Sequence, residues 1–125
     1  MKYLRRLILP LLGLLIASTS MAHHSFAGVD MQKETTITGV VKEFEWTNPH
    51  IWIRLEVINE KGEVEEWSIE TASPNVLGRR GWARDTVKAG DKVTITFNPM
   101  RDGSRGGSLR SITLPSGKVL SIIFA

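Results

Sequence analysis

Three histidines are the residues in this chain with the clearest potential for chemistry. His23 and His24 are adjacent in "MAHHSF", and His50 lies in "EWTNPHIW". The chain has no cysteine, so metal ligation would rest on imidazole nitrogens rather than thiolates. If the chain is cut before His23, its new α-amino group and its imidazole can close a chelate ring around one metal ion. The spacing therefore predicts a metal site made by His23, His24 and His50.

The donor set of this predicted site indicates which metal it would take. Nitrogen donors without sulfur favour Cu(II), with Ni(II) and Zn(II) behind it. Copper oxygenases that cleave polysaccharides also pair a terminal histidine with a distant one, but the only tyrosine here, Tyr3, precedes the predicted cut. The sequence lacks the motifs of hydrolases and phosphate-binding enzymes, which favours a carrier or accessory protein over an enzyme. The alternative is that His23 and His24 are a polar chain start and that His50 is structural.

The predicted cut follows from the first 22 residues. Three basic side chains occur in residues 1–6, residues 7–16 form an apolar run, and small residues stand at Ser20 and Ala22. This is the pattern of a secretory signal peptide cleaved after Ala22. The apolar run is shorter than the roughly 20 residues that a membrane-spanning helix needs. We therefore expect export to the periplasm or beyond, without a stable membrane anchor after cleavage.

Removal of the leader changes the charge of the protein. The whole chain has a formal net charge of +3, and three of its 16 Lys and Arg residues lie in residues 1–22, which contain none of the 13 Asp and Glu residues. The predicted mature chain is therefore neutral. Since nucleic-acid binding rests mainly on cationic side chains that meet phosphates, this balance predicts that nucleic acid is not a partner.

The chain from Thr35 onward has the alternation of β-strands. Residues 35–46, 50–58, 64–70 and 91–99 alternate apolar with polar side chains, and residues 108–125 add one or two further strands around a "PSG" turn. In the first of these, Ile37 and Val41 are expected on one face, and Val40 with Phe44 on the other. The sequence predicts an all-β domain over residues 35–125, preceded by an arm at residues 23–34.

One short helix is expected between the third and fourth strands. Ser73 suits the N-cap, Pro74 suits the first helical position and Gly81 suits the residue past the end. Three strands, a helix and two or three more strands is the order of an OB-fold. We therefore predict a small, partly open OB-like barrel of five to six strands.

The open face of such a barrel provides a second candidate site. Trp52 and Arg54 point away from the apolar row of their strand, and aromatic side chains on this face can stack on ligands. A basic group follows the helix at Arg79 and Arg80 and can meet an anionic ligand or cap the helix. The rival to a metal carrier is thus a module that binds an envelope glycan or protein. Its expected ligand-binding residues are Trp46, Asn48, Trp52, Arg54, Arg79 and Arg80.

Four segments together resemble a known family. "AHHSF", "EWTNPHIW", "SPNVLGRRGW" and "AGDKVT" are similar to family 6152 among the domains of unknown function, a group of small secreted bacterial proteins. The resemblance implies a single exported domain and marks the three histidines, Trp46, Asn48, Arg79 and Arg80 as positions of the family pattern. It implies no activity, because none is established for the family.

Overall fold

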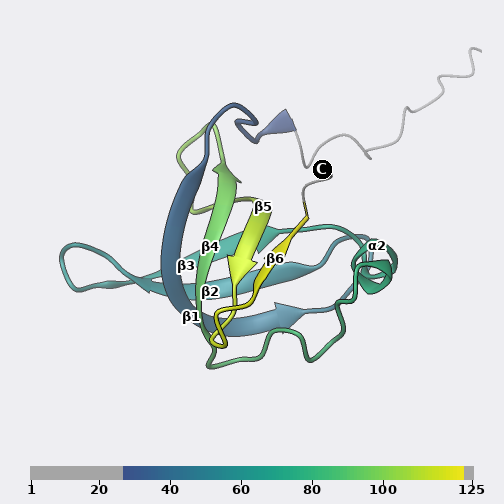
Figure 1. Cartoon of the computed structure of the whole chain (residues 1–125). Coiled ribbons are helices and arrows are strands. Elements are labelled where there is room, and N and C mark those ends of the chain that lie inside the picture. The colour runs from purple at the N-terminus through teal and green to yellow at the C-terminus, as the bar shows by residue number, and fades with distance from the viewer. Residues whose placement is uncertain (1–26, 123–125) are drawn as a thin grey trace, which may run out of the picture.

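Alternating apolar residues produce six strands and one short helix within residues 27–122, the part of the chain that the computed structural model describes (Figure 1). In chain order the elements are β1 (Thr35–Glu45), β2 (Trp52–Ile58), β3 (Val64–Glu70), α2 (Pro74–Arg79), β4 (Lys92–Pro99), β5 (Gly106–Thr113) and β6 (Val119–Ser121).

The strands form one curved sheet in the order β3-β2-β1-β4-β5-β6. Neighbouring strands are antiparallel, and β3 also pairs in parallel with β5 from Ser68↔Gly106 to Glu70↔Ser108. This pairing closes a five-stranded barrel, to which β6 adds at the edge of β5. The prediction of an OB-like barrel with a helix between its third and fourth strands is confirmed.

The core fills the barrel with the inward side chains of each strand. Side chains with less than 2% of their surface exposed include Ile53 and Leu55 on β2, Ile69 on β3, and Ile95 and Phe97 on β4. Burial of each such side chain contributes about 1.5–3 kcal/mol relative to exposure. The alternation predicted for β2, β3 and β4 is therefore confirmed.

A bulge in β1 changes the expected faces of that strand. The pairing of β1 with β2 shifts between Val41 and Glu43, so one extra residue is inserted on the β1 side. Phe44 consequently packs against the core, as Val41 does, while Val40 stays 43% exposed. The prediction that Phe44 shares a face with Val40 is wrong, because strict alternation does not allow for the inserted residue.

The helix begins and ends where its capping residues require. The Ser73 hydroxyl accepts a hydrogen bond from the Val76 backbone N–H at 3.2 Å, and Pro74 occupies the first turn. Gly81 follows the helix at φ +85°, a conformation that favours glycine. Leu77 is fully buried and fixes α2 to the barrel.

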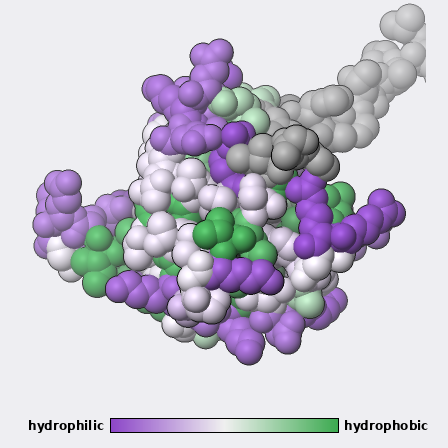
Figure 2. Space-filling model, in the orientation of Figure 1, coloured by the Kyte–Doolittle hydropathy of each residue, from purple (hydrophilic) through white to green (hydrophobic). Residues whose placement is uncertain are grey.

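The outside of the barrel differs from one side to another. The surface over β1 and β4 is of intermediate hydropathy in Figure 2, and there Thr36 pairs with Thr96 and Thr38 with Thr94 through hydroxyl contacts of 3.0 Å. Within residues 27–122, none of the helical structure is long and apolar enough to cross a membrane.

Candidate functional site

His50 is held by Glu70. His50 precedes β2, and the Ile51 N–H donates to the Ala72 carbonyl at 3.0 Å, which extends the pairing of β2 and β3 past their ends. This brings the His50 ring beside the last residue of β3, where Nδ1 of His50 hydrogen-bonds Oε1 of Glu70. The two side chains retain 33% and 17% of their exposure. The imidazole is thus oriented through Nδ1, and Nε2 is its second ring nitrogen.

Trp52 and Arg54 lie side by side on the outer face of β2. The Arg54 guanidinium carbon lies 4.6 Å from the centre of the Trp52 ring, a cation–π distance. Arg54 also donates two hydrogen bonds of 3.0 Å to the two carboxylate oxygens of Glu45. These hydrogen bonds hold the pKa of Glu45 below its usual range, against an opposing effect of burial. Arg54 is therefore a neutralised, fixed support for Trp52.

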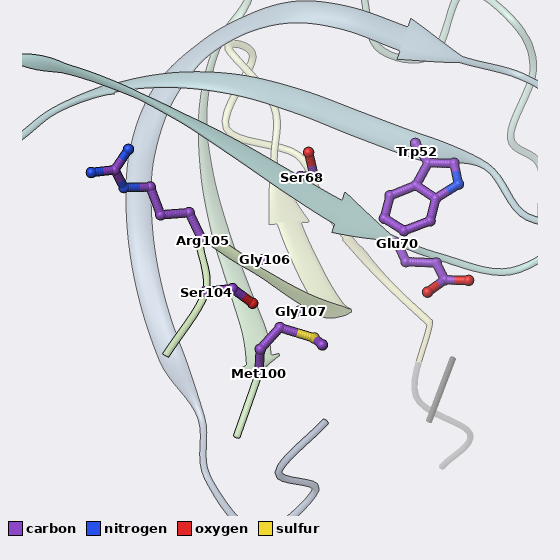
Figure 3. Close-up of a pocket in the computed structure, with 8 residues that line it drawn as sticks. All are labelled: Trp52, Ser68, Glu70, Met100, Ser104, Arg105, Gly106 and Gly107. Carbon is purple, nitrogen blue, oxygen red and sulfur yellow. The ribbon is translucent and has the colours of Figure 1, made fainter. Parts of the chain in front are cut away.

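A pocket of about 460 Å³ opens beside these residues, between β2–β3 and the loop that joins β4 to β5 (Figure 3). Trp52 and Glu70 project into one side, and the Met100 thioether projects from another. The Arg105 side chain extends away from Trp52 and Glu70. The lining residues are Trp52, Ser68, Glu70, Met100, Ser104, Arg105, Gly106 and Gly107.

Two glycines in the pocket lining let the strands pack closely there. A side chain at Gly106 would place Cβ 2.8 Å from the Ser68 carbonyl oxygen, and one at Gly107 would place it 2.1 Å from the Asn98 carbonyl oxygen. Both distances are shorter than real Cβ contacts, so β5 can approach β3 and β4 only as bare backbone. The same pair that closes the barrel thereby supplies a flat peptide wall to the pocket.

The first described residues are attached next to this pocket. Val29 forms a bridge with Met100, and the Gly28 carbonyl accepts a hydrogen bond from the Arg101 N–H at 2.8 Å. The Asp30 N–H donates to the Pro99 carbonyl at 2.8 Å. The chain therefore enters the barrel beside Met100, one of the residues that line the pocket with Glu70.

The structure places the other predicted residues in different environments. His23 and His24 lie outside the described residues. Within residues 27–122 there is no cluster of three or more acidic or histidine side chains that could hold a metal ion, so His50 and Glu70 form only a pair. Trp46 contacts the Phe44 ring edge-on at 5.9 Å and packs against the core, while Asn48 is exposed in the loop before His50.

Arg79 and Arg80 lie apart from the pocket lining. Arg79 is exposed in the last turn of α2, and the Arg80 guanidinium donates a 2.6 Å hydrogen bond to the Ile122 carbonyl, beyond the end of β6. Arg80 therefore ties the chain after β6 to the helix, a structural contact that sequence reasoning did not anticipate.

Sequence reasoning missed the other half of the pocket. Glu70 and Met100 carry no motif, and "RDGSRGG" has the polar, glycine-rich composition of an ordinary surface loop. The adjacent Gly106 and Gly107 at the start of β5 were the available signal, since glycine inside a strand often marks a close approach of backbones.

A family model matches residues 13–110, most of the chain, and its description is a family of unknown function, DUF6152. The chain belongs to DUF6152. The match agrees with the resemblance carried by the four segments of sequence. Among curated proteins, none is similar enough to match this DUF6152 member.

Solved structures similar to this DUF6152 member share its fold at low sequence identity. Two crystal forms of Rim1, a mitochondrial single-stranded DNA-binding protein from S. cerevisiae, superpose with TM-scores of 0.51 and 0.50 at 13% and 10% identity. The alignments cover 66% of this chain and 93% and 92% of the Rim1 chains. A selenomethionine-labelled form of Rim1 superposes with a TM-score of 0.50 at 14% identity. That alignment covers 66% of this chain and 94% of the Rim1 chain.

These neighbours correct one prediction. The expectation that nucleic acid is not a partner is wrong, because proteins of the same fold are single-stranded DNA-binding proteins. That expectation rested on predicted export and on the neutral charge of the predicted mature chain. Recognition of single strands also uses aromatic stacking, which a net charge does not measure.

Proposed function

We propose that this DUF6152 member is a small exported metal-binding protein, and that it carries copper through His50 and the histidines of its mature amino terminus. The observation that carries the proposal is the contact between Glu70 and Nδ1 of His50. Histidines that ligate metals commonly donate their other ring N–H to a carboxylate, which fixes the tautomer and raises the basicity of the ligating nitrogen. His50 has this arrangement, with Nε2 as the ligating atom.

The position at which the chain enters the barrel supports the remaining ligands. Val29 is bridged to Met100, which lines the pocket together with Glu70. Three residues lie between His23 and Ala27, the first described residue, so four residue-to-residue steps join the two positions. At 3.3–3.6 Å per residue they reach about 14 Å when extended. Cleavage after Ala22 then gives His23 an α-amino nitrogen and an imidazole with which to complete the site.

The donor set favours copper. The α-amino nitrogen, the rings of His23 and His24, and Nε2 of His50 are all nitrogen donors, and such a set binds Cu(II) ahead of Ni(II) and Zn(II). Each donor must be deprotonated to bind, so affinity falls with decreasing pH.

Calorimetric titration of Cu(II) and Zn(II) into the processed protein tests this function. Mass spectrometry first establishes that His23 is residue one. We expect micromolar or tighter Cu(II) binding that is lost in His23→Ala and weakened in His50→Ala. Weak binding that neither substitution changes would remove the proposal.

A second candidate function is the binding of single-stranded nucleic acid on the β2–β3 face. It is supported by the single-stranded DNA-binding proteins that share the fold and by Trp52, a half-buried ring on that face. Fluorescence anisotropy of a labelled oligothymidine tests it. We expect binding that weakens as salt rises and that is lost in Trp52→Ala. Unchanged anisotropy at low salt would eliminate this candidate.

A further inference from the structure

We infer that the pocket beside Trp52 and Glu70 binds a ligand that carries a primary ammonium group on an apolar stem. The pocket adjoins the proposed metal site through Glu70, which lines the pocket and hydrogen-bonds Nδ1 of His50, whereas His50 itself is not among the lining residues. It would be the ligand site of the barrel's outer face, and it does not require that the protein bind a metal.

Charge is the first argument. Glu70 is the one carboxylate among the residues that line the pocket. Two carboxylates on β1 and β3 are paired with cations: Glu45 by the two hydrogen bonds from Arg54, and Glu65 by Arg105 at 3.5 Å. Glu70 is hydrogen-bonded by Nδ1 of His50, a bond that a neutral imidazole can donate. The Glu70 side chain lines the pocket and is only 17% exposed. A carboxylate in this environment attracts a cation.

The apolar walls are the second argument. The Trp52 indole and the Met100 thioether project toward the space beside Glu70 (Figure 3). Aromatic rings attract cations through their negative faces, and thioethers provide polarizable contacts for an alkyl stem. Because Glu45 neutralises Arg54, the guanidinium stacked on Trp52 does little to repel a second cation at that ring.

The shape of the pocket is the third argument. Gly106 and Gly107 are largely buried and carry no side chain, so the part of the pocket wall that they form is peptide backbone. The hydroxyl of Ser104 already donates to Asp102 at 2.6 Å. Arg105 extends away from Trp52 and Glu70, so the Glu70 carboxylate is the charged group on this side of the pocket and a strong acceptor for an ammonium. The volume of about 460 Å³ leaves room for a stem of several carbons.

The proposal is tested by NMR titration of the isotopically labelled full mature protein with n-butylammonium and with n-butanol. The two probes have the same stem and differ in charge. Trp52 indole and Gly106 and Gly107 backbone amide shifts report binding at the pocket. We expect a dissociation constant in the millimolar range for n-butylammonium and one at least about ten-fold higher for n-butanol. Equal binding of the two probes, or no shift with either, would overturn the proposal.

Matched variants separate the pocket from the rest of the surface. Glu70→Gln removes the charge with little change of shape and is expected to weaken n-butylammonium binding by about ten-fold or more, because a charge-assisted hydrogen bond is lost. Glu66→Gln is the control, an exposed carboxylate on the same strand that pairs with Lys42. Ser68→Lys is a second variant, which places the protein's own ammonium at the pocket wall and should block the probe. Unaltered affinity in Glu70→Gln would contradict the assignment.

The source of the amine is distinguished by two further probes. Tighter binding of a short lysine-containing peptide than of n-butylammonium would identify a partner's lysine as the ligand, whereas equal binding would indicate a free amine. Both results support an ammonium site. Binding of chitotriose without binding of n-butylammonium would assign the pocket to a glycan and overturn the proposal.

Discussion

Glu70 hydrogen-bonds Nδ1 of His50 and at the same time lines the pocket opposite Met100. One carboxylate therefore connects the loop before β2 with the outer face of the barrel. The sequence separates the two residues by 20 positions, and the extended pairing of β2 with β3 brings them together. The predictions below test the parts of this arrangement one by one.

The first prediction concerns the orienting role of Glu70 in metal binding. Glu70→Gln should weaken Cu(II) binding by about 10- to 100-fold, the usual cost of removing the carboxylate behind a ligating histidine. Competition against a chelator of known affinity measures the change. Glu66→Gln is the control on the same strand and should bind Cu(II) as the wild type does. Equal losses in the two variants would show that Glu70 acts only through bulk charge.

The second prediction concerns the closure of the barrel at Gly107. In Gly107→Ala the new Cβ would meet the Asn98 carbonyl oxygen at 2.1 Å, a backbone atom that cannot move without breaking the pairing of β4 and β5. We expect a loss of roughly 3 kcal/mol or more in the free energy of unfolding, at the upper end for overpacked sites. Urea denaturation followed by circular dichroism measures it.

The matched control for that variant is Gly78→Ala. Gly78 lies in α2, has no positive φ, and has nothing within 4 Å of the position of an added Cβ. Alanine is favoured over glycine in a helix, so this variant should gain up to about 1 kcal/mol. A Gly107→Ala protein as stable as the wild type would contradict the close approach of the strands.

The third prediction concerns the pH dependence contributed by Glu45. Arg54 lowers the pKa of Glu45 from 4.5, so the folded state favours the ionised carboxylate. The stabilisation is present above the unfolded pKa and is lost as the pH falls through the lower folded pKa. Wild type should exceed Glu45→Gln in stability by up to about 1 kcal/mol at neutral pH, and the difference should disappear as the pH falls below the lowered folded pKa of Glu45.

Urea denaturation at neutral and acidic pH measures this difference. Glu60→Gln, in the exposed turn between β2 and β3, is the matched control for the removal of one carboxylate. If the difference in unfolding free energy between wild type and Glu45→Gln stays constant with pH, the contact of Glu45 with Arg54 stabilises the fold through packing rather than through charge.

The strands were predictable because their apolar side chains alternate. β3 has the predicted limits of Val64–Glu70, and the capping of α2 by Ser73 followed from its residue type. The faces of β1 were only partly predictable. The inserted residue between Val41 and Glu43 moves Phe44 to the core side, and a bulge of this kind leaves no trace in the hydrophobic pattern.

The pocket was harder to predict than the fold. Trp52 was identified because a large aromatic side chain on the outer face of a strand is unusual. Its companions Glu70 and Met100 come from distant segments, and their convergence depends on the parallel pairing of β3 with β5. Such pairing is a long-range property that local sequence does not encode.

The central claim is that His50 and the mature amino terminus together hold copper. Electron paramagnetic resonance of the Cu(II)-loaded, correctly processed protein tests it most directly. The account predicts a spectrum of nitrogen-ligated Cu(II) that changes in His50→Gln and again when one alanine is added before His23, since the added residue abolishes the terminal chelate. A spectrum that is the same in all three proteins would contradict the claim.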